Sequence, residues 1–268
     1  MVDNFKILVI SRKEKSERKK FQNDQAKKYD LDIQYLDATT PNTIPKNIFK
    51  RYKNSWARPL RISEVACTHS HMLAWKKILN WNVPTLILED DAVLSSSIKK
   101  ILQEVSKIKG QDYLQFETFN TKKLLGKKSI HLEMSNYKLH KLHRDGAGSA
   151  AYFVFPSGAR KLIDSLKRSY PPADAAIHLA AGIKRLQIVP AAAVQIMNLS
   201  DKQKQSLNIK KIERSSIFIE AKPPFSSKLR WCICKSKRLS ISFKLFFRII
   251  SANDSHYLIL KFLENDKI

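Results

Sequence analysis

Three consecutive carboxylates close an apolar segment of this chain, and this combination restricts both its fold and its chemistry. Residues 84–88 (Pro-Thr-Leu-Ile-Leu) are typical of a buried β-strand, and Glu89, Asp90 and Asp91 follow without a break. Because side chains alternate along a strand, Glu89 and Asp91 point to one side of it and Asp90 to the other. Three neighbouring anions repel one another, so a balancing cation is expected, and divalent metals prefer oxygen ligands. The alternative is a solvated turn in which the acids cluster by chance.

The remaining sequence alternates between segments typical of strands and segments typical of helices. This pattern predicts an α/β domain with a mostly parallel central sheet. Ser11 is placed to cap the first helix, and residues 38–60, which contain three prolines, are expected to form an irregular loop. Strands are expected at 5–10, 31–36, 84–89, 112–116, 151–155 and 186–189, and helices at 12–28, 63–80, 97–107 and from Pro156 to the prolines at 171 and 172.

The charge of the chain restricts its partners. There are 49 Lys and Arg residues against 24 Asp and Glu, a formal net charge of +25, while a hydrophobic content of 43% is typical of a globular protein. A charge of this size favours anionic partners: nucleic acid, anionic lipid or a phosphorylated glycan. A basic loop is expected at 120–144, followed by a turn at 145–149.

The C-terminal part differs in composition from the rest, so the predicted domains are a catalytic domain at 1–200 and a basic, mainly helical extension at 201–268. Lys228 to Ile250 mixes large apolar residues with Lys and Arg. Such a segment can lie on an anionic membrane surface or pack on the catalytic domain with an ordinary basic face, and both interpretations stay open.

The N-terminus has no signal-peptide pattern, and no run of eighteen apolar residues occurs. Three cysteines do not make a disulfide framework, so a reduced, cytoplasmic compartment is expected. The Cys232–Cys234 pair has no second Cys/His pair at the spacing of a zinc site.

Four sets of motifs, in this order, resemble glycosyltransferase family 25, the lipopolysaccharide and lipooligosaccharide glycosyltransferases. The resemblance covers roughly residues 5–200. The sequence departs from the family pattern at Ser63 and Ala66, where glycines are usual, at Ala175, where a second acid is frequent, and at Ile10-Ser11, where the family usually has Asn-Leu. The motifs are Leu8-Val9-Ile10-Ser11 with Glu17-Arg18; Ser63 to His71, with its Cys67-x-x-Ser70-His71 spacing; Leu88 to Asp91; and Ala151 to Val154 with Gly158 to Lys161 and Pro172-Ala173-Asp174.

The resemblance implies a GT-A-like fold that binds a UDP-sugar at the carboxyl ends of its strands. In this interpretation Asp91 ligates Mn²⁺ or Mg²⁺ with support from Glu89. Glu89 otherwise contacts the ribose. The metal stabilises the departing diphosphate as a Lewis acid. His71 either lines the donor pocket or is a structural histidine, and Arg18 either pairs with a phosphate or lies on a solvated helix face. The residues assigned to the donor site are Glu89, Asp90, Ser11, Arg18 and His71.

For an inverting reaction, the resemblance makes Asp174 the base that accepts the proton of the acceptor hydroxyl. The alternative is that Asp174 caps the helix that follows it. Asp145 and Glu117 are the other candidate bases.

The implied activity transfers galactose or glucose from UDP-galactose or UDP-glucose to a lipooligosaccharide acceptor, on the cytoplasmic face of an anionic membrane. No nucleic acid is expected as a partner. The competing interpretations are a basic nucleic-acid-binding protein, which leaves the acidic triplet unexplained, and a non-catalytic protein associated with the membrane.

Overall fold

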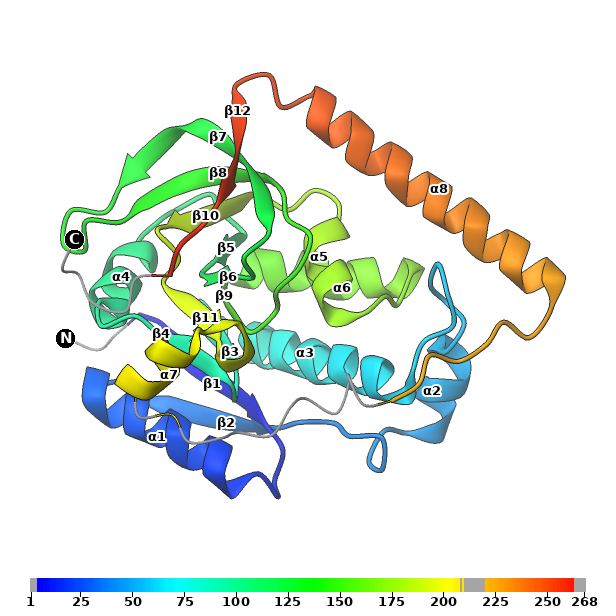
Figure 1. The fold of residues 1–268 in the computed structure, drawn as a ribbon, viewed down its shortest axis with the longest axis horizontal. Coiled ribbons are helices and arrows are strands. Elements are labelled where there is room, and N and C mark those ends of the chain that lie inside the picture. Colours follow the sequence, from blue (N-terminus) through cyan, green and yellow to red (C-terminus); the bar gives the residue numbers. More distant parts are fainter. Residues whose placement is uncertain (1–3, 208, 210–219, 263–268) are drawn as a thin grey trace.

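The computed structural model describes residues 4–207, 209 and 220–262 of the chain. Among these residues, a large mixed sheet runs through the molecule in the order β12-β7-β8-β10-β5-β9-β3-β1-β2, and a small sheet has the order β4-β11-β6 (Figure 1). The strands of the large sheet are β1 (Lys6–Ser11), β2 (Ile33–Asp37), β3 (Thr85–Glu89), β5 (Tyr113–Gln115), β7 (Lys122–His131), β8 (Lys138–Arg144), β9 (Ala151–Val154), β10 (Arg185–Val189) and β12 (Ser255–Ile259); those of the small sheet are β4 (Ala92–Leu94), β6 (Glu117–Thr118) and β11 (Ala193–Gln195).

Helices cover both faces of the large sheet, because its central strands are apolar on both sides. Alternate residues of β3 enter different cores: Leu86 and Leu88 pack with α4, whereas Ile87 packs with α3 and α5. The same alternation directs Glu89 towards α3. The helices are α1 (Ser16–Tyr29), α2 (Lys46–Tyr52), α3 (Ile62–Trp81), α4 (Ile98–Val105), α5 (Pro156–Arg168), α6 (Ala173–Leu179), α7 (Asp201–Ser206) and α8 (Lys228–Ile250), with a 3₁₀ turn η1 (Ile196–Asn198).

The α/β class is as predicted, but the sheet is less parallel than the alternating pattern indicated. Strands β2 and β3 run parallel to β1, and β10 runs parallel to β5. Strand β9, however, lies between β3 and β5 and is antiparallel to both. Strands β8, β7 and β12 continue the sheet by antiparallel pairing. Strand β9 follows β8 without an intervening helix, so no crossover connection requires it to run parallel to its neighbours.

Three local predictions were wrong. The segment 38–60 is not irregular throughout, because it contains helix α2. The basic segment 120–144 is a β-hairpin, β7–β8, rather than a loop. Ser11 is the last residue of β1 and does not cap a helix, since α1 begins at Ser16 after Lys15.

The described residues of the C-terminal extension form the short helix α7, the long helix α8 and the strand β12. Helix α8 lies along the outside of the molecule (orange in Figure 1), and β12 pairs with β7 at the end of the large sheet. The predicted boundary at residue 200 stays a prediction. Parts of the predicted extension, residues 208, 210–219 and 263–268, lie outside the described residues.

Candidate active site

The acidic triplet lies where β3 ends, and the neighbouring strand β1 supplies the first of its partners. Ser11, at the end of β1, donates a hydrogen bond from Oγ to Asp90 Oδ2 at 2.9 Å. Arg18 of α1 donates to Asp90 Oδ1 at 2.6 Å and lies 3.5 Å from Asp91 Oδ2. The Arg18 side chain is only 13% exposed, so it does not lie on a solvated helix face. The fold therefore gives Asp90 both a hydroxyl and a guanidinium as partners.

The carboxylate of Asp91 has weaker hydrogen-bonding and ionic partners than that of Asp90. Its Oδ1 atom is buried and has no hydrogen-bond partner among the described residues. Burial and the charge of Glu89 raise the pKa of Asp91 from 3.8 to about 7, although Arg18 opposes this shift. A buried carboxylate with an unpaired oxygen is costly unless a cation joins it.

Glu117 also has a buried carboxylate oxygen without a partner among the described residues, and its pKa depends on the charges of Glu89 and Asp91. Its Oε2 accepts a hydrogen bond from the Ala150 backbone N–H at 2.8 Å, but its Oε1 is buried and has no partner among the described residues. Burial raises the pKa of Glu117 to about 8, and the charges of Glu89 and Asp91 add to the shift. We call Glu89, Asp91 and Glu117 the acid cluster. The sequence identified Glu117 only as an alternative base, because its partners come from distant segments.

Glu89 is the ionised member of the acid cluster. Its Oε1 accepts a hydrogen bond from Ser149 Oγ at 2.6 Å and lies 3.4 Å from Nε2 of His71. Burial opposes ionisation, but these donors and the charge of Arg18 outweigh it, and the pKa of Glu89 is lowered. The Glu89 side chain remains 26% exposed, so it is still accessible from solvent.

The orientation of His71 follows from a buried chain of hydrogen bonds. Trp75 Nε1, which can only donate, is 3.0 Å from the Tyr152 hydroxyl oxygen, and that hydroxyl lies 2.7 Å from Nδ1 of His71. Tyr152 therefore has its own proton to give to Nδ1. This pattern assigns the remaining proton of a neutral His71 to Nε2, the atom that faces Glu89.

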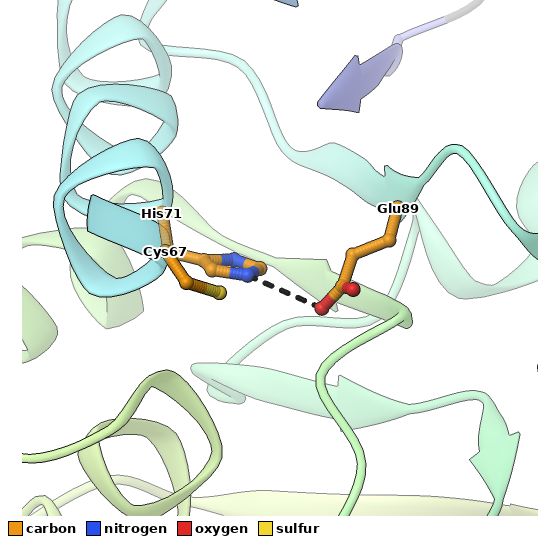
Figure 2. A group of neighbouring side chains, drawn as sticks. All are labelled: Cys67, His71 and Glu89. Atoms are coloured by element: carbon orange, nitrogen blue, oxygen red, sulfur yellow. Dashed lines mark ion pairs between the residues drawn. The ribbon is translucent and has the colours of Figure 1, made fainter. Parts of the chain in front are cut away.

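Figure 2 shows a second set of potential metal ligands, which shares Glu89 with the acid cluster. Cys67 and His71 project from α3 towards Glu89, and their ligand atoms lie within 4.8 Å of one another. Burial and the nearby charges of Glu89 and Asp174 raise the pKa of the Cys67 thiol well above its usual value. A thiol that resists ionisation is a poor metal ligand. The carboxylate oxygens of the acid cluster offer a hard cation such as Mg²⁺ or Mn²⁺ the ligands it prefers.

Asp174 lies in the first turn of α6 and is half-buried. The cap position of this helix is occupied by Pro172, so Asp174 is not the N-cap residue; its Oδ1 accepts from the Ala175 backbone N–H at 2.7 Å. The charges of Asp174 and Glu89 both raise the pKa of the Cys67 thiol, so both carboxylates lie near this side chain.

Asp145 is enclosed in a structural network. Its side chain is fully buried and accepts a hydrogen bond from Lys123 Nζ at 2.6 Å, and Lys123 also donates to the Glu117 carbonyl and to Gln187. The charge of Lys123 and that of His178 outweigh burial and lower the pKa of Asp145. A carboxylate enclosed in this way cannot reach an acceptor hydroxyl, so Asp145 is unsuited to be the base.

The loop before β9 fits closely against the acid cluster at Gly148. Gly148 has φ +104°, a conformation that other residues rarely adopt, and a Cβ atom there would lie 2.8 Å from Oε2 of Glu117. The sequence predicted only a turn here. The run Asp145-Gly146-Ala147-Gly148-Ser149 was the available signal, since it holds two of the six glycines of the chain.

Comparison with known proteins decides the family of this chain. Residues 4–177 match the sequence profile of glycosyltransferase family 25 (LPS biosynthesis protein). The chain belongs to glycosyltransferase family 25. The resemblance carried by the motifs is thereby confirmed, and the acid cluster, Arg18, His71 and Asp174 all lie within the matched region.

Two relatives of this family 25 chain come from Haemophilus influenzae. The chain is 26% identical over 163 residues to "Lipooligosaccharide biosynthesis protein lic2B", which covers 58% of this chain and 60% of the relative. It is also 26% identical over 174 residues to "Putative glycosyltransferase" of strain ATCC 51907 / DSM 11121 / KW20 / Rd, covering 63% of this chain and 60% of the relative. The matches thus span less than two thirds of each relative. No helix within the described residues has the length and apolar character needed to cross a membrane.

Proposed function

We propose that this family 25 chain is a metal-dependent, inverting hexosyltransferase. The donor is UDP-galactose or UDP-glucose, and the acceptor is the core of a lipooligosaccharide or lipopolysaccharide. The proposal rests on two buried carboxylate oxygens, one on Asp91 and one on Glu117, that have no hydrogen-bond partner among the described residues. They accompany Glu89 at the end of a central strand. Ligands of open α/β sheets bind at such strand ends.

The residues present fit a divalent cation. Asp91 and Glu89 would hold Mn²⁺ or Mg²⁺, and Glu117, whose pKa responds to the charges of both, would add a third carboxylate. When bound, such a cation would neutralise the negative charge that develops on the departing UDP. Asp90 is not assigned as a metal ligand, because its two carboxylate oxygens accept hydrogen bonds from Ser11 and Arg18. His71 donates towards Glu89 and keeps it ionised, so that it stays a ligand at neutral pH.

Asp174 is the base of the proposed reaction. It is half-buried rather than enclosed, and it borders the region that contains Glu89. Its carboxylate would accept the proton of the acceptor hydroxyl as that oxygen attacks the sugar carbon opposite the leaving group. An Asp174→Asn protein that keeps its turnover number would exclude this role.

The acceptor would be reached at the cytoplasmic surface of an anionic membrane. Helix α8 supports this part, because its apolar side faces away from the protein. Leu229 is 71% exposed, Phe243 54% and Phe247 64%, while Cys234 on the opposite side is buried. The helix contains seven Lys and Arg residues and no acid. An outward apolar face with basic flanks is suited to insertion at an anionic lipid surface.

The membrane part is tested with vesicles. The protein should co-sediment with phosphatidylglycerol vesicles at low salt and much less with phosphatidylcholine vesicles. A Phe243→Glu/Phe247→Glu protein should lose binding. Equal binding to both vesicle types, unaffected by salt or by these substitutions, would contradict it.

The donor site is tested by thermal unfolding with UDP, with Mn²⁺ and with EDTA. A ligand that binds only the folded state raises the melting temperature. We expect UDP to raise it only when Mn²⁺ is present, and Asp91→Asn to lose this effect. Asp24→Asn, an exposed acid on α1, is the matched control and should keep it. Direct Mn²⁺ titration by electron paramagnetic resonance gives a readout that does not depend on turnover. If neither UDP nor another nucleoside diphosphate stabilises the wild type with Mn²⁺, the proposed function is wrong.

A further inference from the structure

Helix α8 does not pack flush against the protein, and a groove of about 650 Å³ separates it from α5 and α6. In Figure 1 helix α8 lies on the outer side of α5 and α6, at the edge of the molecule. The inner wall includes Trp56 and the small residue Ala175. Pockets of several hundred cubic ångströms accommodate small organic ligands, and this volume suits a short oligosaccharide.

The groove is strongly basic. Four cations line it, and no Asp or Glu is among its lining residues. Two of the cations are fixed in place: Lys237 donates to the Ser55 carbonyl at 2.9 Å, and Arg248 donates to the His178 carbonyl at 2.8 Å. The other two, Arg168 and Lys244, are exposed and face the groove from opposite walls. Cations gathered around a groove repel one another, so an anionic ligand is favoured there.

The position of the groove connects it with the proposed chemistry. Ala175 in its inner wall directly follows Asp174, the proposed base. Its outer wall is α8, whose other side carries the exposed apolar residues. A ligand in the groove would thus have one end beside Asp174 and the other beside the surface proposed to contact lipid.

We propose that this groove binds the phosphate-bearing inner part of a glycolipid acceptor and presents its terminal sugar to Asp174. The proposal rests on the proposed function. Cations on both walls would contact phosphate groups, and Trp56, with Ile241 and Leu245 of α8, supplies the apolar surface on which sugar rings pack. The four cations set the preference for a phosphorylated glycan over a neutral one.

The test uses lipooligosaccharide that has been fully deacylated, because this water-soluble oligosaccharide keeps its phosphates but cannot insert into a bilayer. Its dissociation constant is measured by isothermal titration calorimetry on the full chain. The same oligosaccharide dephosphorylated with hydrofluoric acid and inorganic phosphate alone are the comparison ligands. The groove variant is Arg168→Ala/Lys244→Ala. The matched control is Lys167→Ala/Arg238→Ala, which removes the same charge from the same two helices at exposed positions outside the groove.

We expect the groove variant to raise the dissociation constant for the phosphorylated oligosaccharide at least tenfold and the control to change it less than twofold. Dephosphorylation should weaken binding to the wild type to a similar extent, and inorganic phosphate should bind far more weakly than the oligosaccharide. A Ser240→Trp protein, which fills the groove from α8, should also bind more weakly. The Mn²⁺-dependent stabilisation by UDP, measured on every variant, reports separately on the fold and the donor site.

Equal binding by the groove and control variants would overturn the proposal, as would binding that does not depend on phosphate or wild-type protein that does not bind the oligosaccharide. If UDP and Mn²⁺ still stabilise the protein in those cases, the proposed transferase function survives and only the groove assignment fails.

Discussion

Asp91→Asn should make the metal-free protein more stable at neutral and alkaline pH, although it removes a charged residue from the proposed active site. Asp91 is buried, one of its oxygens has no partner among the described residues, and its pKa in the folded state is about 7 instead of 3.8. The folded protein therefore binds more protons than the unfolded chain between these two values. Its stability must fall as the pH rises through this window.

The size of the effect follows from the same shift. Each pKa unit corresponds to 1.36 kcal/mol, so ionising Asp91 in the folded state costs up to about 4 kcal/mol, a cost that it shares with its neighbour Glu117. For a protein of this size, about 1 kcal/mol changes the melting temperature by roughly 2–4 °C. Because Asn cannot ionise, Asp91→Asn should melt about 5–10 °C above the wild type at pH 8. At pH 5, which lies in the lower part of the same window, the difference should be roughly a third as large.

The assay is thermal unfolding by circular dichroism in EDTA from pH 5 to pH 8.5, on wild type, Asp91→Asn and the exposed control Asp24→Asn. Wild type and control should lose stability with rising pH, and Asp91→Asn should lose less of it. Adding Mn²⁺ should stabilise the wild type at pH 8 and leave Asp91→Asn unchanged. If Asp91→Asn is less stable than the wild type at pH 8 in EDTA, then Arg18 already compensates Asp91, and the argument for a cation at the acid cluster fails.

Three further substitutions test the surroundings of the acid cluster. Gly148→Ala should abolish Mn²⁺-dependent stabilisation by UDP, because the new methyl group meets a carboxylate oxygen at 2.8 Å, whereas Gly146→Ala, where a Cβ meets no atom within 4 Å, should keep it. Tyr152→Phe should cost about 1–3 kcal/mol in urea unfolding, since it leaves two buried ring nitrogens without their hydroxyl; an unchanged midpoint would disprove the hydrogen-bond chain. Lys123→Met should cost about 3–5 kcal/mol by leaving Asp145 buried without its lysine counter-ion, and most of this loss should be recovered in Lys123→Met/Asp145→Leu; a double variant as unstable as the single one would contradict this account.

The sequence predicted best where a single local pattern determined the outcome. The strand ending at Glu89 was expected at 84–89 and spans Thr85–Glu89, because an uninterrupted apolar run has few other folds. Helix α3, expected at 63–80, spans Ile62–Trp81. The direction of β9 could not be predicted in this way, since parallel and antiparallel central strands have the same apolar composition.

The β7–β8 hairpin shows why the basic segment was misjudged. Lys122 and Lys123 look alike in the sequence, yet Lys122 is exposed and Lys123 is fully buried. Burial of Lys123 depends on Asp145 and Gln187, which lie 22 and 64 residues further along the chain. A local pattern contains no information about such partners, so the lysines were taken as a solvated loop.

The three consecutive acids with which the sequence began have different partners, and this difference is what gives the site its chemistry. Strand alternation separates Glu89 from Asp90, and β1 and α1 then meet Asp90 with a hydroxyl and a guanidinium. Glu89 receives Ser149 and His71 and remains ionised. Asp91 shares the guanidinium with Asp90, its Oδ1 has no hydrogen-bond partner among the described residues, and its charge raises the pKa of Glu117. If the triplet served only to stabilise the fold, all three carboxylates would be expected to have partners. The described residues supply too little positive charge at Asp91 and Glu117, and this is where the proposed cation would bind and meet the diphosphate of the proposed donor.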